Sequence, residues 1–255
     1  MNLECFSAGA SILHRVDVRL KLISAFFFSV VVALCHSLRA PLIALLVAAV
    51  FVFVARLPML KVVRRLFMVN LFTLLFWLTL PLTVPGELLI KLGPLVISRP
   101  GVDLAGLITL KTNAIVLAFL ALVATSGVAD IGHALASLKL PNRFCMLLLF
   151  TYRYIFVLQQ EYQRLRRAAL LRGFKPMTSM HTYQTYGNLL GMTLVKSWQR
   201  GIRVQQAMVL RGFQGKFYTL ESRSPMAADW SLFALIFLVA VGIALMESLS
   251  TAGGW

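Results

Sequence analysis

The composition of this chain is that of an integral membrane protein. Its 255 residues are 59% hydrophobic, and the mean hydropathy is +0.82, which excludes a soluble domain because one of this length would expose large apolar patches to water. The net charge is +16, from 25 Lys and Arg against 9 Asp and Glu. Because the basic residues alternate with apolar helix faces and no nucleic-acid-binding signature is present, we expect the lipid bilayer, and no nucleic acid, as a partner.

Five apolar runs along the chain are candidate membrane-spanning helices. They cover residues 20–35, 40–55, 66–84, 104–126 and 230–246. The first two are short for the roughly 20 residues that a span needs, although flanking side chains can snorkel to the interface. The predicted fold class is therefore an all-α integral membrane protein with about five transmembrane helices and additional amphipathic cytoplasmic helices.

The charges of the loops predict the orientation of these spans. The flank of the first run and the loop after the second carry an excess of basic residues, namely Arg15, Arg19 and Lys21, then Arg56, Lys61, Arg64 and Arg65. The charges between the third and fourth runs cancel, so that loop is expected outside. The chain is thus predicted to lie in the cell inner (cytoplasmic) membrane, with its N-terminus cytoplasmic and its C-terminus external.

A further apolar stretch, residues 144–158, is ambiguous because it is short and contains Arg153. An arginine in mid-membrane costs about 2.5–3.5 kcal/mol. If this stretch crossed, residues 159–225, with eleven Lys and Arg against Glu161 and Glu221, would lie outside. We therefore predict one long cytoplasmic helix over 143–172, a second over 184–210 and a short lead-in helix over 131–138. The predicted domains are a four-span bundle (1–126), a cytoplasmic helical region (127–225) and a C-terminal span (226–255).

The tetrapeptide Leu-Arg-Gly-Phe occurs twice, at 171–174 and again 39 residues later at 210–213, and each copy ends one of the two predicted cytoplasmic helices. The same offset relates Arg164 to Arg203. One interpretation is a helix stop, in which Gly adopts the left-handed conformation, Arg complements the helix dipole and Phe packs back. Because capping does not require the same residue each time, the duplication also favours docking by two arginines.

This order of elements resembles the transmembrane T component of energy-coupling factor (ECF) transporters. That family carries a pair of Ala-Arg-Gly motifs at the ends of two cytoplasmic coupling helices, and Arg172-Gly173 and Arg211-Gly212 are similar to their cores. Leu171 and Leu210 stand where the family has Ala. The segment over residues 11–22, Ser-Ile-Leu-His-Arg-Val-Asp-Val-Arg-Leu-Lys-Leu, also resembles the family's N-terminal segment.

The resemblance implies a coupling and scaffold subunit that performs no chemistry. Its expected partners are two cytoplasmic ABC-type ATPases, which receive the motif arginines and bind ATP and Mg²⁺, and a membrane S component that binds the substrate. No cofactor is expected on this chain. The implied coupling residues are Arg172, Gly173, Arg211 and Gly212, with supporting contacts from Leu171, Phe174, Leu210, Phe213, Arg164 and Arg203. The resemblance favours cobalt or nickel as the transported substrate, as in the CbiQ type, and a vitamin-type importer is the alternative.

Other function classes find less support in the residues. There is no P-loop sequence, and the four histidines are scattered without metal-ligand spacing, so we expect neither catalytic residues nor a metal site. A self-sufficient secondary carrier or channel stays open as a less favoured alternative, because ion-coupled carriers usually place carboxylates inside the membrane and this chain has almost none there.

Overall fold

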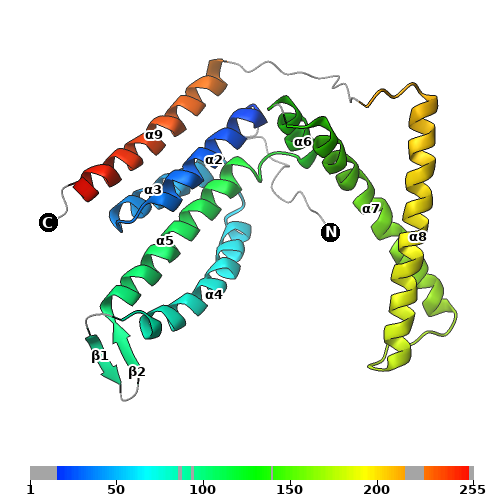
Figure 1. Cartoon of the computed structure of the whole chain (residues 1–255), viewed down its shortest axis with the longest axis horizontal. Coiled ribbons are helices and arrows are strands. Elements are labelled where there is room, and N and C mark those ends of the chain that lie inside the picture. Colours follow the sequence, from blue (N-terminus) through cyan, green and yellow to red (C-terminus); the bar gives the residue numbers. More distant parts are fainter. Residues whose placement is uncertain (1–15, 86–87, 93–94, 139, 216–226, 253–255) are drawn as a thin grey trace. The chain divides into compact units, whose positions relative to one another are not determined.

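The computed structural model describes residues 16–85, 88–92, 95–138, 140–215 and 227–252. It divides the chain into two compact units, which we call unit 1 (residues 1–131 with 222–255) and unit 2 (residues 132–221). The described residues are almost entirely helical, which confirms the all-α membrane class (Figure 1). The predicted domain boundary at 225/226 and residues 11–15 of the N-terminal segment lie outside the described residues.

Unit 1 holds five helices within its described part, and each overlaps one of the five predicted apolar runs. They are α2 (Val18–Leu34), α3 (Arg39–Val54), α4 (Met59–Thr83), α5 (Arg99–Leu122) and α9 (Ala227–Ala252). In the described part of the chain, three of them, α4, α5 and α9, are long and apolar enough to cross a membrane, and α3 is a shorter apolar helix. The helix α4 begins seven residues before the predicted run at 66, because Lys61, Arg64 and Arg65 interrupt the apolar residues of its first two turns.

A short β-hairpin, which we did not predict, connects α4 to α5. Strands β1 (Leu88–Leu92) and β2 (Leu95–Ser98) pair antiparallel, with Leu92 opposite Leu95. The sequence does carry a signal for it, since Gly93-Pro94 separates two short apolar runs.

The core of unit 1 is built on small side chains that let α3 and α5 approach closely. Ala44 and Ala48 of α3 and Ala114 and Ala121 of α5 are completely buried, at 0% exposure. Small residues at such contacts allow dense van der Waals packing, which drives helix association where lipid replaces water. The helix α9 packs against α2 and α3, whereas α4 packs mainly against α5 and β2 and leaves most of its apolar side chains exposed.

Polar contacts tie unit 1 together near the loop between α2 and α3. The Glu247 carboxylate of α9 accepts hydrogen bonds from the backbone N–H groups of His36 and Ser37 at 2.5 and 3.0 Å, and from the Ser37 hydroxyl at 2.6 Å. On α5, Lys111 donates its Nζ to the carbonyl of Ala33, at 2.8 Å. The end of α2 is therefore fastened to both α5 and α9.

Unit 2 consists of two long crossing helices, as shown in Figure 1. The helix α7 (Asn142–Leu171) confirms the predicted single helix over 143–172, and α8 (Met180–Leu210) confirms the second, although it begins four residues before 184. Its earlier start is explained by Ser179, whose Oγ accepts from the Thr182 N–H at 3.4 Å and so caps the helix. The short helix α6 (Val128–Ser137) matches the predicted lead-in helix and includes the boundary between the units.

Candidate functional site

The helix α7 ends in a complete Schellman motif at the first Leu-Arg-Gly-Phe copy. Gly173 adopts a left-handed backbone with φ +85°. Its N–H donates to the carbonyl of Leu170 at 3.1 Å, and the N–H of Phe174 donates to the carbonyl of Ala169 at 3.2 Å. These two bonds satisfy carbonyls that a helix end otherwise leaves unpaired.

The helix α8 repeats this ending, residue for residue. Gly212 has φ +74°, its N–H donates to Val209 at 3.0 Å, and the N–H of Phe213 donates to Met208 at 3.1 Å. Arg172 and Arg211 both have φ −86° and ψ near zero. The backbone therefore presents the two arginines in the same local geometry, at the last position before each left-handed glycine.

The leucine and arginine side chains of both motifs lie on the surface. Leu171 and Leu210 are 89% and 88% exposed, and both arginines are exposed. Within the described part of the chain, neither Arg172 nor Arg211 has a hydrogen-bond or ion-pair partner for its guanidinium. Packing inside the chain thus explains the glycines but not why each helix ends in the same Leu-Arg pair.

The two phenylalanines behave differently from the arginines, because they pack back into the helix pair. The Phe174 ring makes edge-to-face contacts with His181 and Tyr186 of α8, at centroid distances of 6.5 and 5.7 Å. Phe213 is half-buried and lies beside Met208 in the groove between α7 and α8. Of the predicted supporting residues, the phenylalanines therefore fix the helix ends, while Leu171 and Leu210 remain on the surface.

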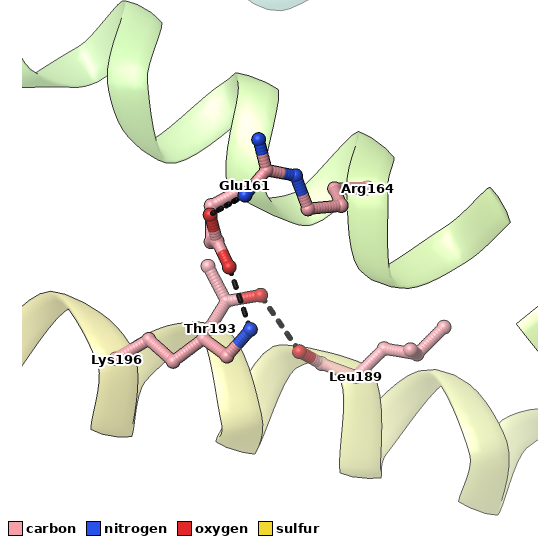
Figure 2. A network of polar contacts seen from close by, with 5 residues as sticks. All are labelled: Glu161, Arg164, Leu189, Thr193 and Lys196. Atoms are coloured by element: carbon pink, nitrogen blue, oxygen red, sulfur yellow. Dashed lines mark hydrogen bonds and ion pairs between the residues drawn. The ribbon is translucent and has the colours of Figure 1, made fainter. Parts of the chain in front are cut away.

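One ion pair joins α7 to α8 at their crossing (Figure 2). Lys196 of α8 donates its Nζ to the Glu161 carboxylate at 2.6 Å, and Arg164 of α7 lies 3.8 Å from the other Glu161 oxygen. The hydrogen bond from Lys196 lowers the pKa of Glu161 below its ordinary value, with Arg164 and Arg200 adding to the effect. Arg203, the counterpart of Arg164, is exposed and makes no such pair with the described residues.

Beside this crossing, α7 and α8 enclose an apolar groove of about 780 Å³. Its lining comes from the first two thirds of α7 and the second half of α8, and includes Phe150, Tyr154, Leu158, Val204 and Met208. In the described residues no group of three or more His, Cys, Asp or Glu lies close enough together to hold a metal ion. The site thus offers exposed arginines on glycine-terminated helix ends and an apolar groove, which suit docking.

Helices long and apolar enough to span a membrane, together with a pair of long basic helices, are typical of a membrane-embedded subunit. The sequence model of the family CbiQ, described as cobalt transport protein, matches residues 9–222. The energy-coupling factor transporter transmembrane protein EcfT of Bacillus subtilis is 26% identical over 220 residues, covering 81% of this chain and 82% of the relative. The cobalt transport protein CbiQ of Rhodobacter capsulatus is 24% identical over 168 residues, covering 64% and 68%.

An uncharacterized protein of Methanocaldococcus jannaschii is 27% identical over 140 residues, and there the match spans about half of each protein, 54% of this chain and 52% of the relative. The chain belongs to the CbiQ/EcfT family, the transmembrane T components of ECF transporters.

Proposed function

We propose that this chain is the non-enzymatic coupling subunit of an ATP-driven importer, in which Arg172 and Arg211 dock into two cytoplasmic ATPases. The observation that carries the proposal is the pair of identical Schellman ends, each presenting an exposed Leu-Arg pair that no contact within the described chain explains. Two equal ends suit two equal or similar partners. ATP and Mg²⁺ belong to those partners, and a substrate-binding S component shares the membrane.

The proposal requires α7 and α8 to lie on the cytoplasmic side, with the N-terminus cytoplasmic and the C-terminus external. The family and the membrane helices support a cell-membrane location. The basic residues of α7 and α8 support the sidedness, because cytoplasmic segments carry the excess of Lys and Arg.

Cobalt or nickel is the substrate class that we propose. It is supported by the description of the family and by the name of the Rhodobacter capsulatus relative. Relatives named EcfT align over more of the chain than that CbiQ protein does, 81% against 64% for the Bacillus subtilis relative. A T component of a vitamin-type importer is therefore the second candidate, and uptake of Co²⁺ by the assembled complex distinguishes the two.

The test is co-purification of ATPase subunits with the full-length chain from membranes. Arg172→Glu and Arg211→Glu each place a carboxylate where a guanidinium is needed, and the loss of one member of a desolvated charge pair costs about 2–5 kcal/mol. Because about 1.4 kcal/mol is tenfold in affinity, each variant should weaken ATPase binding by roughly thirtyfold or more.

Arg166→Glu is the matched control, since Arg166 is an exposed arginine on the same helix outside the repeated motif. It should leave ATPase binding near the wild-type level. If both motif variants retained the ATPases as well as Arg166→Glu does, the coupling role of Arg172 and Arg211 would be wrong.

A further inference from the structure

The most unusual buried group in unit 1 is a lysine. Lys21, in the first turn of α2, is only 1% exposed and is the largest of the completely buried side chains. A lysine at the end of a membrane helix ordinarily extends its ammonium to the interface. Here the ammonium is kept inside, which is favourable only if other groups compensate its charge.

The compensating groups come from three different segments of unit 1. Lys21 Nζ donates to the Ser126 hydroxyl at 3.4 Å. The carboxylates of Asp229, which is itself 4% exposed, Asp130 and Asp17 attract the ammonium electrostatically. Asp17 is also the N-cap of α2, where its carboxylate accepts from the Arg19 N–H at 2.9 Å.

Ser126 and Asp229 lie on either side of unit 2 in the chain. Unit 2 is an insertion into unit 1, so the chain leaves unit 1 once, after residue 131, and returns to it once, before residue 222. Ser126 lies between the end of α5 and the start of α6, on the way out, and Asp229 lies in the first turn of α9, on the way back. One side chain on α2 therefore interacts with the segment by which the chain leaves unit 1 and with the first turn of the helix after its return.

We propose that Lys21 is a positioning residue for coupling: it anchors Ser126, on the segment that leads to the α7–α8 insert, and the first turn of α9, which follows the insert, to α2, so that movement of the insert is passed to the membrane helices. Without the lysine, the hydrogen bond to Ser126 and the charge attraction to Asp229 are lost, so less of this movement should reach α2. The inference rests on the proposed coupling function, but it concerns a step after ATPase docking.

The experiment uses the full complex of this chain with its co-purifying ATPases in lipid nanodiscs, and it measures amide hydrogen exchange in α2 and α9 with ATP and with ADP. In the wild type, ATP should change the exchange of both helices. In Lys21→Met the ATPases should remain bound while this ATP-dependent change falls by roughly tenfold, as expected for the loss of a hydrogen bond to a charged group. The charge exchange Lys21→Asp with Asp229→Lys should recover part of the change that Lys21→Asp alone loses.

A matched pair of serine variants separates anchoring from general damage. Ser126→Ala removes the hydroxyl that contacts Lys21, whereas Ser24→Ala removes an equally buried hydroxyl that bonds only to the backbone of α2. Only Ser126→Ala should reduce the ATP-dependent change. If Lys21→Met is not recovered from the membrane, the two serine variants test the anchor in its place. Equal ATP-dependent changes in Ser126→Ala and Ser24→Ala would then contradict it.

Two results would overturn the inference. One is a Lys21→Met complex that responds to ATP as the wild type does, and the other is a Lys21→Met chain that no longer binds the ATPases. Neither resembles the failure of the proposed function itself, which is ATPase binding that survives Arg172→Glu and Arg211→Glu.

Discussion

Replacing glycine by alanine should destabilise α8 at its left-handed end but stabilise it in its interior. In Gly212→Ala, a Cβ is forced into a backbone with φ +74°, although no heavy atom lies within 4 Å of its position. The cost is therefore purely conformational, about 1–2 kcal/mol for a non-glycine residue in this region. Because 1–2 kcal/mol changes a local equilibrium by a factor of about 5–30, the end of α8 should open that much more often.

The control is Gly187→Ala, the same substitution in the interior of α8. Gly187 has an ordinary helical backbone and open space around its Cβ position. Alanine there should stabilise the helix by about 0.5–1 kcal/mol. Both substitutions add a Cβ in open space, but only Gly212 has a left-handed backbone, so the two variants should shift stability in opposite directions.

Amide hydrogen exchange on the full-length chain in lipid nanodiscs measures both effects. The N–H groups of Gly212 and Phe213, which bond to Val209 and Met208, should exchange faster in Gly212→Ala. Gly212→Asn should lose less protection than Gly212→Ala, because asparagine tolerates the left-handed region. The reasoning would be refuted if Gly212→Ala protected this helix end as well as glycine does, or if Gly187→Ala lost protection.

Two further predictions concern contacts within each unit. In unit 2, the hydrogen bond from Lys196 lowers the pKa of Glu161. The ion pair therefore stabilises the crossing of α7 and α8 above the ordinary carboxyl pKa of 4.5, and this stabilisation is lost as the pH falls through the lowered pKa. A spin-label distance between α7 and α8 should change over that acid range in the wild type and stay constant in Glu161→Gln. In unit 1, Gly101→Ala would place a Cβ 2.6 Å from the carbonyl oxygen of Leu80 and should lower stability by about 1–3 kcal/mol in thermal unfolding. Gly106→Ala on the same helix meets no atom within 4 Å and should not lower stability. Equal effects of the two alanines would contradict the close packing of α4 on α5.

The sequence was sufficient to predict the helices because their signals are local. Apolar runs locate the helices of unit 1, and the charge balance of residues 159–225 led to α7 being predicted as one helix rather than a span. The ends at Gly173 and Gly212 were equally accessible, since a glycine after a basic helix is a local stop signal. Sidedness and docking stay predictions, because they depend on a membrane and on partner proteins.

The sequence did not predict which side chains contact one another in the folded chain. The loop charges predict Lys21 to be one of the basic residues that flank the first span, yet its side chain is buried, bonded to the Ser126 hydroxyl and attracted electrostatically by Asp229. A signal existed, because Lys21 lies inside the predicted run 20–35, and an ionisable residue in a membrane segment usually has a partner. Periodicity cannot name that partner, since Ser126 and Asp229 are brought to it only by the packing of α5 and α9 on α2.

The hydrogen bonds of Glu247 have a consequence for biogenesis. The loop at His36 and Ser37 is synthesised long before Glu247, so water satisfies its two N–H groups and the Ser37 hydroxyl until α9 is made. The carboxylate of Glu247 then replaces that water and joins the hairpin of α2 and α3 to the last helix. Nascent chains stalled before residue 227 should accordingly lack this connection, even though they already contain α2 to α8.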